Sequence, residues 1–274
     1  MINNVSKIHF ISGLPRSGST LLSGILRQNP RTHAAMSGPV ALMCQSIQPQ
    51  MCGAGEFSTM FDDDLRRTMF RGIFNAYYSN IKAELIFDTN RAWQKQTALV
   101  ASLYPESKII CCVREISWIV DSVEQMLNKN PLQLSRLLGF ATGESVYDRS
   151  DHLMESKNGF IGRCLAGFRE AWFSEHAGRL IVVPYENLVR EPQRTVNRLY
   201  EALGEVPFEH DFLNVEYDEP DFDEKIGMPG LHKVDRKVEY RERQPCIPPD
   251  LFAKYGELNF WQRPEQNLRG VKII

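Results

Sequence analysis

The chain has 274 residues, of which 43% are hydrophobic and 24% charged, so it has the composition of a folded protein with little room for a long disordered tail. Lys and Arg number 32 against 34 Asp and Glu, and the net charge of −2 argues against a general nucleic-acid-binding protein. No apolar stretch reaches the about 18 residues that a membrane-spanning helix needs, and the six cysteines include no CxxC pair. We therefore expect a cytoplasmic protein without disulfides or a metal site.

Short apolar segments bounded by turn residues recur along the chain and predict buried strands. Each is continuously apolar rather than alternating, which is typical of strands that are covered on both faces of a parallel sheet. In chain order these segments are residues 7–14, a weaker candidate at 32–36, and then 84–88, 108–113 and 179–185.

Helical patterns separate the strands. Residues 62–81 carry apolar side chains at intervals of four and begin with three acidic residues, which the positive end of a helix dipole favours. A second pattern covers residues 195–203, after Pro192 and before Gly204. Strands that alternate with helices predict an α/β fold, with three layers (α/β/α) around a mostly parallel central sheet, and we expect residues 1–274 to form one domain.

The most informative segment is the loop GLPRSGST at residues 13–20, between the first strand and a helical pattern. In such a loop the backbone N–H groups converge on an anion, and the N-terminus of the following helix adds partial positive charge. The spacing from Gly13 to Gly18 matches the GxxxxG of nucleotide-triphosphate loops. Ser19 stands where those loops have Lys, however, and the loop's cation is Arg16, so hydrolysis of ATP or GTP is disfavoured.

This loop resembles the 5′-phosphosulfate loop of sulfotransferases that use 3′-phosphoadenosine-5′-phosphosulfate (PAPS), which reads Pro-(Lys/Arg)-Ser-Gly-(Thr/Ser)-Thr. The Arg form is most similar to the tyrosylprotein branch and to a group of bacterial sulfotransferases. The resemblance implies a P-loop-like fold and a PAPS site. The residues that it assigns to the 5′-phosphosulfate are Arg16, Ser17, Gly18, Ser19 and Thr20.

A second matching segment follows the strand at residues 108–113. The strand ends at Arg114, and Ser122 comes eight residues later, the spacing with which the family holds the 3′-phosphate. Ser117 is placed to cap the intervening helix, whose first turns bring Ser122 beside Arg114 over one phosphate. The resemblance therefore implies that Arg114 and Ser122 bind PAPS.

Two later segments extend the resemblance over most of the chain. Residues 183–188 (VPYENL) are similar to the family's Tyr-Glu-Asp-Leu, which implies that Tyr185 lies near the adenine; the alternative is a core tyrosine. Residues 230–233 (GLHK) resemble the late loop that closes over PAPS, with Lys233 as the phosphate contact. The stretch 233–243 is basic, and it is either a solvated loop or a segment that closes over an anionic ligand.

The proton acceptor has no counterpart in the family pattern. Sulfuryl transfer to a hydroxyl needs a base for the acceptor's proton and cations for the charge on the leaving group. The family's Glu position falls near Ser37, and its His position falls within residues 88–91; neither residue type is present there. The candidates are Asp88, at the carboxyl end of a strand where α/β sheets bind ligands, and His33. Asp88 is alternatively a helix cap or an ion-pair partner of Arg91, which otherwise takes the family's role of stabilising the transferring group.

The sequence thus predicts a PAPS-dependent sulfotransferase that transfers a sulfuryl group to a hydroxyl and releases adenosine 3′,5′-bisphosphate, with no metal. The catalytic residues that we assign are Arg16, Asp88 and Arg91. The acceptor stays open between a tyrosine peptide, a glycan, a lipid and a small phenol, and so does the oligomeric state. The apolar segment 39–61 is either an acceptor-side loop or ordinary core. The rival functions are a nucleoside or small-molecule kinase, which needs Mg²⁺ and a loop Lys, and a non-catalytic nucleotide-binding module.

Overall fold

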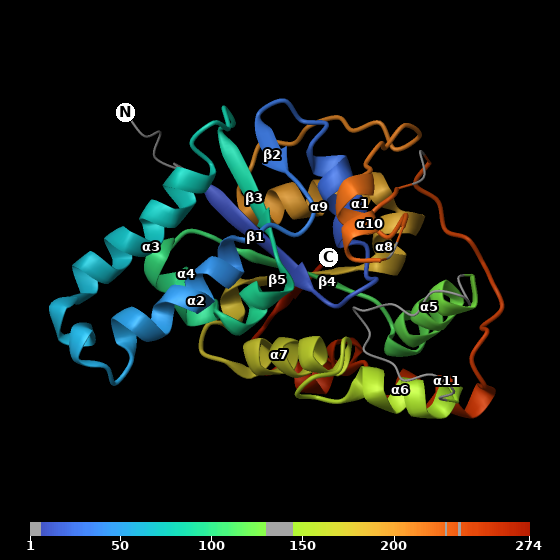
Figure 1. Ribbon diagram of the computed structural model, residues 1–274. Coiled ribbons are helices and arrows are strands. Elements are labelled where there is room, and N and C mark those ends of the chain that lie inside the picture. Colours follow the sequence, from blue (N-terminus) through green and yellow to red (C-terminus); the bar gives the residue numbers. More distant parts are fainter. Residues whose placement is uncertain (1–6, 130–144, 228, 235–236) are drawn as a thin grey trace.

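The computed structural model describes residues 7–129, 145–227, 229–234 and 237–274 (Figure 1). Within these residues, six strands form one sheet in the order β2-β3-β1-β4-β5-β6, and every neighbouring pair is parallel. The predicted α/β fold around a parallel sheet is therefore confirmed. The strands are β1 (Ile8–Gly13), β2 (Thr32–Ala34), β3 (Leu85–Thr89), β4 (Ile109–Val113), β5 (Leu180–Pro184) and β6 (Lys272–Ile273).

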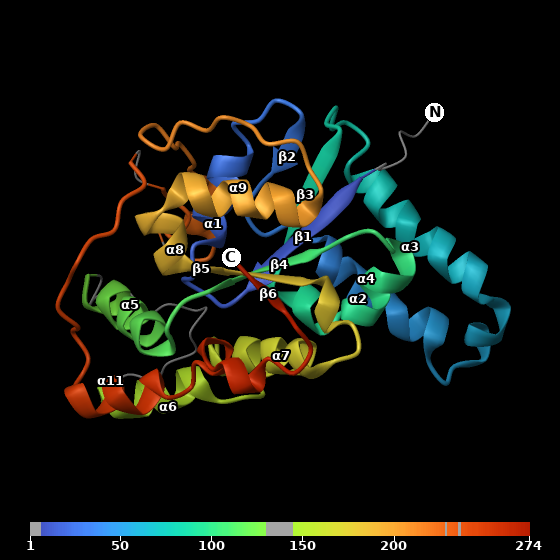
Figure 2. The ribbon, with the colours of Figure 1, turned by 180° about the vertical axis from the view of Figure 1, so that it is seen from behind.

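The described helices lie on both sides of this sheet (Figures 1 and 2). None of them is long and apolar enough to cross a bilayer. The helices are α1 (Ser19–Leu26), α2 (Val40–Cys52), α3 (Asp63–Tyr77), α4 (Thr97–Leu103), α5 (Ile116–Lys129), α6 (Val146–Met154), α7 (Gly162–Phe173), α8 (Tyr185–Arg190), α9 (Pro192–Leu203), α10 (Pro220–Lys225) and α11 (Pro249–Gly256). Short 3₁₀ helices cover Glu56–Met60, Arg91–Lys95, Ala177–Arg179, Phe260–Gln262 and Pro264–Gln266.

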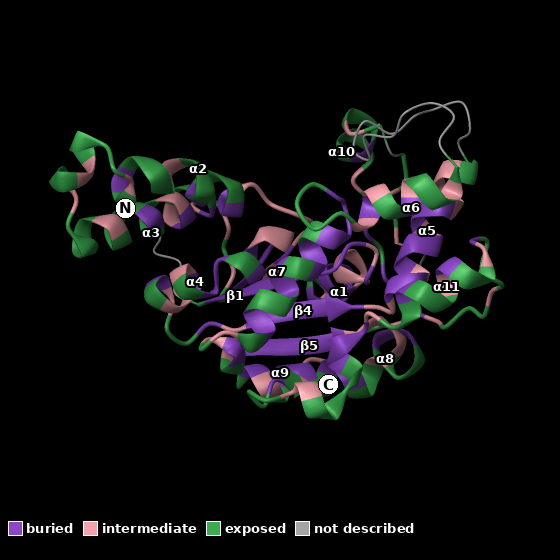
Figure 3. Ribbon diagram, turned by 90° about the horizontal axis from the view of Figure 1, so that it is seen from below, coloured by how far each residue is buried: buried purple, intermediate pink, exposed green. Residues whose placement is uncertain are grey.

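The apolar strands separate two hydrophobic cores, one on each face of the sheet. Successive side chains of a strand point to opposite faces, so Phe10 of β1 packs in the core with α2, α3, α4 and α7, whereas Ile11 packs in the core with α1, α8 and α9. Figure 3 shows β4 and β5 buried along their lengths. This double burial explains why the strands read as continuous apolar runs rather than alternating ones, and it gives the three predicted layers.

Helix boundaries follow the local signals in most places. The Asp62 carboxylate accepts the Leu65 N–H at 2.8 Å and caps α3, which ends at Tyr77 and not at the predicted residue 81. Helix α9 begins with Pro192 in its first turn, before the predicted residue 195, and ends at Gly204 with a left-handed φ of 69°.

The segment at residues 39–61 is mostly helical and is not the loop that we considered. It forms α2 and the 3₁₀ helix that follows, and Val40, Ala41 and Cys44 are fully buried in the core. No residue of this segment lines the cavity described below. Core packing therefore accounts for its buried apolar residues, and the structure gives no support to an acceptor-side role.

Candidate active site

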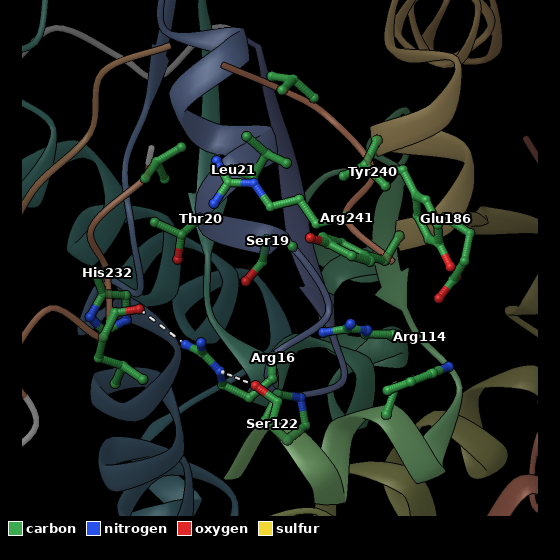
Figure 4. Close-up of a pocket in the computed structure, with 18 of the residues that line it drawn as sticks. Arg16, Ser19, Thr20, Leu21, Arg114, Ser122, Glu186, His232, Tyr240 and Arg241 are labelled. Atoms are coloured by element: carbon green, nitrogen blue, oxygen red, sulfur yellow. Dashed lines mark hydrogen bonds between the residues drawn. The ribbon is translucent and has the colours of Figure 1, made fainter. Parts of the chain in front are cut away.

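A cavity of roughly 680 Å³ opens where β1 and β4 end, which is the edge at which parallel α/β sheets bind ligands. Its walls come from the loop after β1, the start of α5, the start of α8 and the late segment at residues 231–243 (Figure 4). The sequence-predicted residues that line it are Arg16, Gly18, Ser19, Thr20, Arg91, Arg114, Ser122, Tyr185 and Lys233.

The loop after β1 owes its shape to three residues with positive φ, namely Gly13 (110°), Arg16 (57°) and Gly18 (88°). At Gly13 a β-carbon would lie 2.1 Å from the Cys112 carbonyl oxygen, so only glycine fits against β4. The Ser17 hydroxyl, 1% exposed, donates to the same carbonyl oxygen at 2.8 Å. The Ser17 side chain therefore ties the loop to β4, and Ser17 is not among the residues that line the cavity.

Arg16 connects three parts of the cavity wall. Its Nε donates to Ser122 Oγ of α5 at 3.3 Å, and its Nη1 donates to the Leu231 carbonyl oxygen at 3.1 Å (Figure 4). Burial, and after it the positive charge of Arg114, lowers the pKa of Arg16 from its ordinary value, although a guanidinium stays charged in proteins. The structure thus brings together Arg16 and Ser122, which the resemblance assigns to one ligand.

Arg114 presents an unsatisfied donor at the end of β4. Its guanidinium carbon lies 4.5 Å from the ring centroid of Tyr185, and its Nε is buried without a hydrogen-bond partner among the described residues. Burial lowers the pKa of Arg114. A buried N–H that no protein group accepts is rare and costly. Arg114 also lines the cavity, so its guanidinium is placed to meet an anion there.

Tyr185, Arg91 and Lys233 complete the predicted set at the cavity wall. Tyr185 begins α8 and packs on the loop so closely that a β-carbon at Gly18 would lie 2.8 Å from its ring. The Arg91 guanidinium lies 4.8 Å from the Phe160 ring centroid, and burial lowers the pKa of Arg91. The exposed Lys233 lies on the late segment.

Asp88, the proton acceptor that the sequence favours, lies elsewhere. It is a fully buried residue of β3, and its two oxygens accept from the Tyr78 hydroxyl and from Trp93 Nε1, each at 2.7 Å. Burial raises the pKa of Asp88, and the two hydrogen bonds oppose that shift. Asp88 does not line the cavity. It binds neither a helix end nor Arg91, the two alternatives considered, but holds two aromatic side chains of the core.

The second candidate base, His33, also lies outside the cavity. It is half-buried in β2, with its ring centroid 5.7 Å from that of Tyr78. Burial, and then the nearby Arg27, lowers the pKa of His33. Ser37, at the place where the resemblance puts a Glu, does line the cavity but has no carboxylate to offer.

Sequence reasoning assigned no separate role to His232 or Arg243, both of which line the cavity. Asp121 of α5, fully buried, forms an ion pair with Arg243 and accepts the Cys246 N–H at 2.5 Å. The described part of the basic stretch therefore borders the cavity, with Lys237 and Arg241 also exposed to solvent; residues 235 and 236 are outside the described residues. Only its charge pattern signalled this, because its contacts join residues far apart in the chain.

Comparisons with known proteins agree with this architecture. A model of the sulfotransferase family matches residues 9–210. The sulfotransferase domain from the curacin biosynthetic pathway superposes with a TM-score of 0.51 at 19% identity, covering 92% of this chain and 91% of that one. The sulfotransferase domain from the Synechococcus PCC 7002 olefin synthase gives a TM-score of 0.50 at 16% identity, with coverages of 93% and 94%. No curated protein matches the chain.

Proposed function

Because the chain belongs to the sulfotransferase family, we propose that it transfers a sulfuryl group from PAPS to a hydroxyl and releases adenosine 3′,5′-bisphosphate. The observation that carries the proposal is the convergence of Arg16 and Arg114 on one cavity beside a loop whose backbone is shaped for an anion. The Arg114 guanidinium, which lines this cavity together with Arg16, fits an anionic ligand of this kind.

The loop and its helix would hold the 5′-phosphosulfate. Residues 18–20 lead into α1, whose first N–H groups have no partner inside the helix and favour an anion. When the bond between sulfur and the bridging oxygen breaks, its electron pair goes to the phosphate of the leaving nucleotide. A fixed cation next to that oxygen stabilises the developing charge, and Arg16 is the loop's own cation.

Arg114 and Ser122 would hold the 3′-phosphate, with Tyr185 beside the adenine and Lys233 closing from the late segment. These assignments come from the resemblance, and the shared cavity supports them. Arg91, which follows β3 on the other side of β1 from β4, would stabilise the transferring group. We do not assign the proton transfer to Asp88, because both of its oxygens accept from core donors and none faces the cavity.

The proposed acceptor is a hydroxyl. Transfer of radiolabel from PAPS identifies the class of molecule that carries it. Purified protein is incubated with [³⁵S]PAPS and, in separate arms, tyrosine peptides, glycans, hydroxylated lipids and small phenols. We expect label in one of these classes together with stoichiometric adenosine 3′,5′-bisphosphate. A parallel arm with [γ-³²P]ATP and Mg²⁺ tests the kinase alternative. Phosphoryl transfer there, without sulfuryl transfer in any arm, contradicts the proposal.

A further inference from the structure

A carboxylate and an imidazole form a hydrogen-bonded pair on the cavity wall. Asp223 of α10 is fully buried, and its Oδ1 lies 2.5 Å from Nδ1 of His232. Its other oxygen, Oδ2, accepts the backbone N–H of His232 at 2.7 Å. The Phe222 ring meets the imidazole nearly edge-on, with 5.4 Å between centroids. These contacts hold the imidazole in one orientation, with its side chain 13% exposed.

The pair decides which imidazole nitrogen carries the proton. A carboxylate accepts hydrogen bonds, so Nδ1 carries the proton of the neutral ring and Nε2 keeps its lone pair. No described residue makes a hydrogen bond to Nε2, and His232 lines the cavity. The result is an oriented base backed by a buried carboxylate, an arrangement that enzymes use to accept a proton from a hydroxyl.

The imidazole lies next to the loop that would hold the phosphosulfate. Leu231, the preceding residue, accepts the hydrogen bond from Arg16 at 3.1 Å, and Figure 4 shows His232 on this side of Arg16. Val234 donates its N–H to the Tyr217 carbonyl oxygen at 2.9 Å, and the Tyr217 hydroxyl accepts the Met36 N–H at 2.6 Å. The late segment is thereby anchored on both sides of His232.

Other titratable groups of the cavity are less well placed for this role. Glu186 lies on the Arg114 side, away from His232 (Figure 4). Glu239 pairs with Lys237 and Arg241. Glu115, adjacent to Arg114 in the chain, shares its side of the cavity.

We propose that His232 is the catalytic residue that accepts the proton of the acceptor hydroxyl, and that Asp223 positions it; this rests on the proposed function. As the acceptor oxygen forms its bond to sulfur, the O–H proton moves to Nε2 of His232. The bond between sulfur and the bridging oxygen breaks, and its electron pair leaves with the phosphate of adenosine 3′,5′-bisphosphate. The Asp223 carboxylate keeps its hydrogen bond to Nδ1 and stabilises the imidazolium, which later releases the proton to water.

The test compares His232→Gln and Asp223→Asn with His176→Gln, a matched change of a histidine that pairs with Glu175 and does not line the cavity. Calorimetric PAPS affinity monitors the proposed function, and we expect all three variants to bind within about twofold of the native protein. Transfer of ³⁵S to phenol then monitors the base. We expect His232→Gln to lower kcat by about 10²–10⁴-fold, the usual contribution of a positioned base, while His176→Gln stays at the native rate.

Acceptor acidity separates a base from a merely structural histidine. With 4-nitrophenol, which ionises in mildly alkaline solution without help, His232→Gln should lose less than about tenfold, because little proton transfer remains to be catalysed. Asp223→Asn should lower kcat with phenol without raising KM, and the double variant should be no slower than His232→Gln, since the two residues act as a unit. Equal losses with both phenols contradict the proposal.

Hydrolysis of PAPS, in which water is the acceptor, tests the role of His232 without knowledge of the natural acceptor. His232→Gln should slow the release of labelled sulfate by about tenfold or more, and imidazole added to His232→Ala should restore part of it. A native hydrolysis rate in His232→Gln overturns the role of His232 while leaving the proposed function intact. Failure of the native protein to bind PAPS overturns the proposed function itself.

Discussion

The cavity has two walls that are built in different ways. The strand-end wall is the loop at residues 13–20 together with Arg114, and it is tied to the sheet by backbone geometry: the Leu14 N–H donates to the Cys112 carbonyl oxygen at 2.9 Å. The late wall consists of residues 217–243 as far as they are described. It is held by contacts with distant elements, such as the hydrogen bond from the Arg16 side chain to the Leu231 carbonyl oxygen.

The difference suggests a division of labour. Most of the groups that would bind the anionic donor come from the edge of the sheet, with Lys233 of the late wall as the exception, and small errors in their position are costly. The residue that we propose for proton transfer comes from the late wall, none of whose described residues belongs to a strand of the sheet. Substitutions in the two walls should therefore affect different quantities.

The largest expected effect is on folding, at Gly13. A β-carbon in Gly13→Ala would meet the backbone of Cys112 at 2.1 Å, and φ is 110°, so we expect the free energy of unfolding to fall by about 3 kcal/mol or more. The control is Gly230→Ala in the late wall, where φ is 76° but no atom lies within 4 Å; it should lose only about 1 kcal/mol. Urea unfolding measures both, and equal losses would erase the distinction between the walls.

The next effect is on donor affinity. Arg16→Ala and Arg114→Ala should each weaken PAPS binding by about 1.5–3 kcal/mol, the value of a hydrogen bond to a charged group. Arg194→Ala is the matched control, because Arg194 pairs with Glu191 on the surface at 2.7 Å and does not line the cavity. Calorimetry with the folded variants provides the measurement. If both cavity variants bind PAPS as the native protein does, the strand-end wall is not the donor site.

A smaller effect is expected where the late wall is attached to α5. Asp121→Asn removes the charge that pairs with Arg243 and weakens the hydrogen bond to the Cys246 N–H. We expect the free energy of unfolding to fall by about 1.5 kcal/mol, from the lost charged hydrogen bond, and protease cleavage within residues 237–246 to accelerate. Unchanged proteolysis would show that other contacts hold the segment.

A further effect, on the pH profile of stability, is expected at His9, a buried residue near the start of β1. Burial lowers the pKa of His9 from 6.5 to about 4, against the opposing pull of Glu205, and Nδ1 accepts the Lys108 N–H at 3.0 Å. The unfolded chain therefore binds the proton more readily, so stability is lost as the pH falls from about 6.5 toward 4. His9→Gln should flatten this part of the profile in urea unfolding; an unaltered slope would exclude His9 as its cause.

What could be predicted from the sequence follows the same division. The strands and the loop at residues 13–20 were predictable because local composition determines them, and Arg16 and Arg114 follow directly from strand ends. The position of the Asp88 side chain was not predictable, because the alternation of side chains along β3 decides which face of the sheet it points to. On that face Tyr78 and Trp93 donate hydrogen bonds to it.

In the late wall, the loop at residues 230–233 and the basic stretch were noted from the sequence, but the pairing of side chains within it was not predictable, for a related reason. The pair formed by Asp223 and His232 depends on a chain reversal between α10 and the late segment that no periodic pattern announces. The two-residue strand β6 was missed because it is too short to carry a pattern, although Ile274 after it donates its N–H to the Val182 carbonyl oxygen at 3.0 Å.

The central claim, that the cavity binds PAPS, is tested most directly by ligand-dependent thermal stability. Native protein is titrated with PAPS, adenosine 3′,5′-bisphosphate and ATP with Mg²⁺. A ligand at a hundred times its Kd adds about 2.7 kcal/mol to the stability of the folded state, so we expect a saturable rise of Tm with PAPS and with adenosine 3′,5′-bisphosphate, and a much smaller one in Arg114→Ala. Stabilisation by ATP with Mg²⁺ alone would contradict the account.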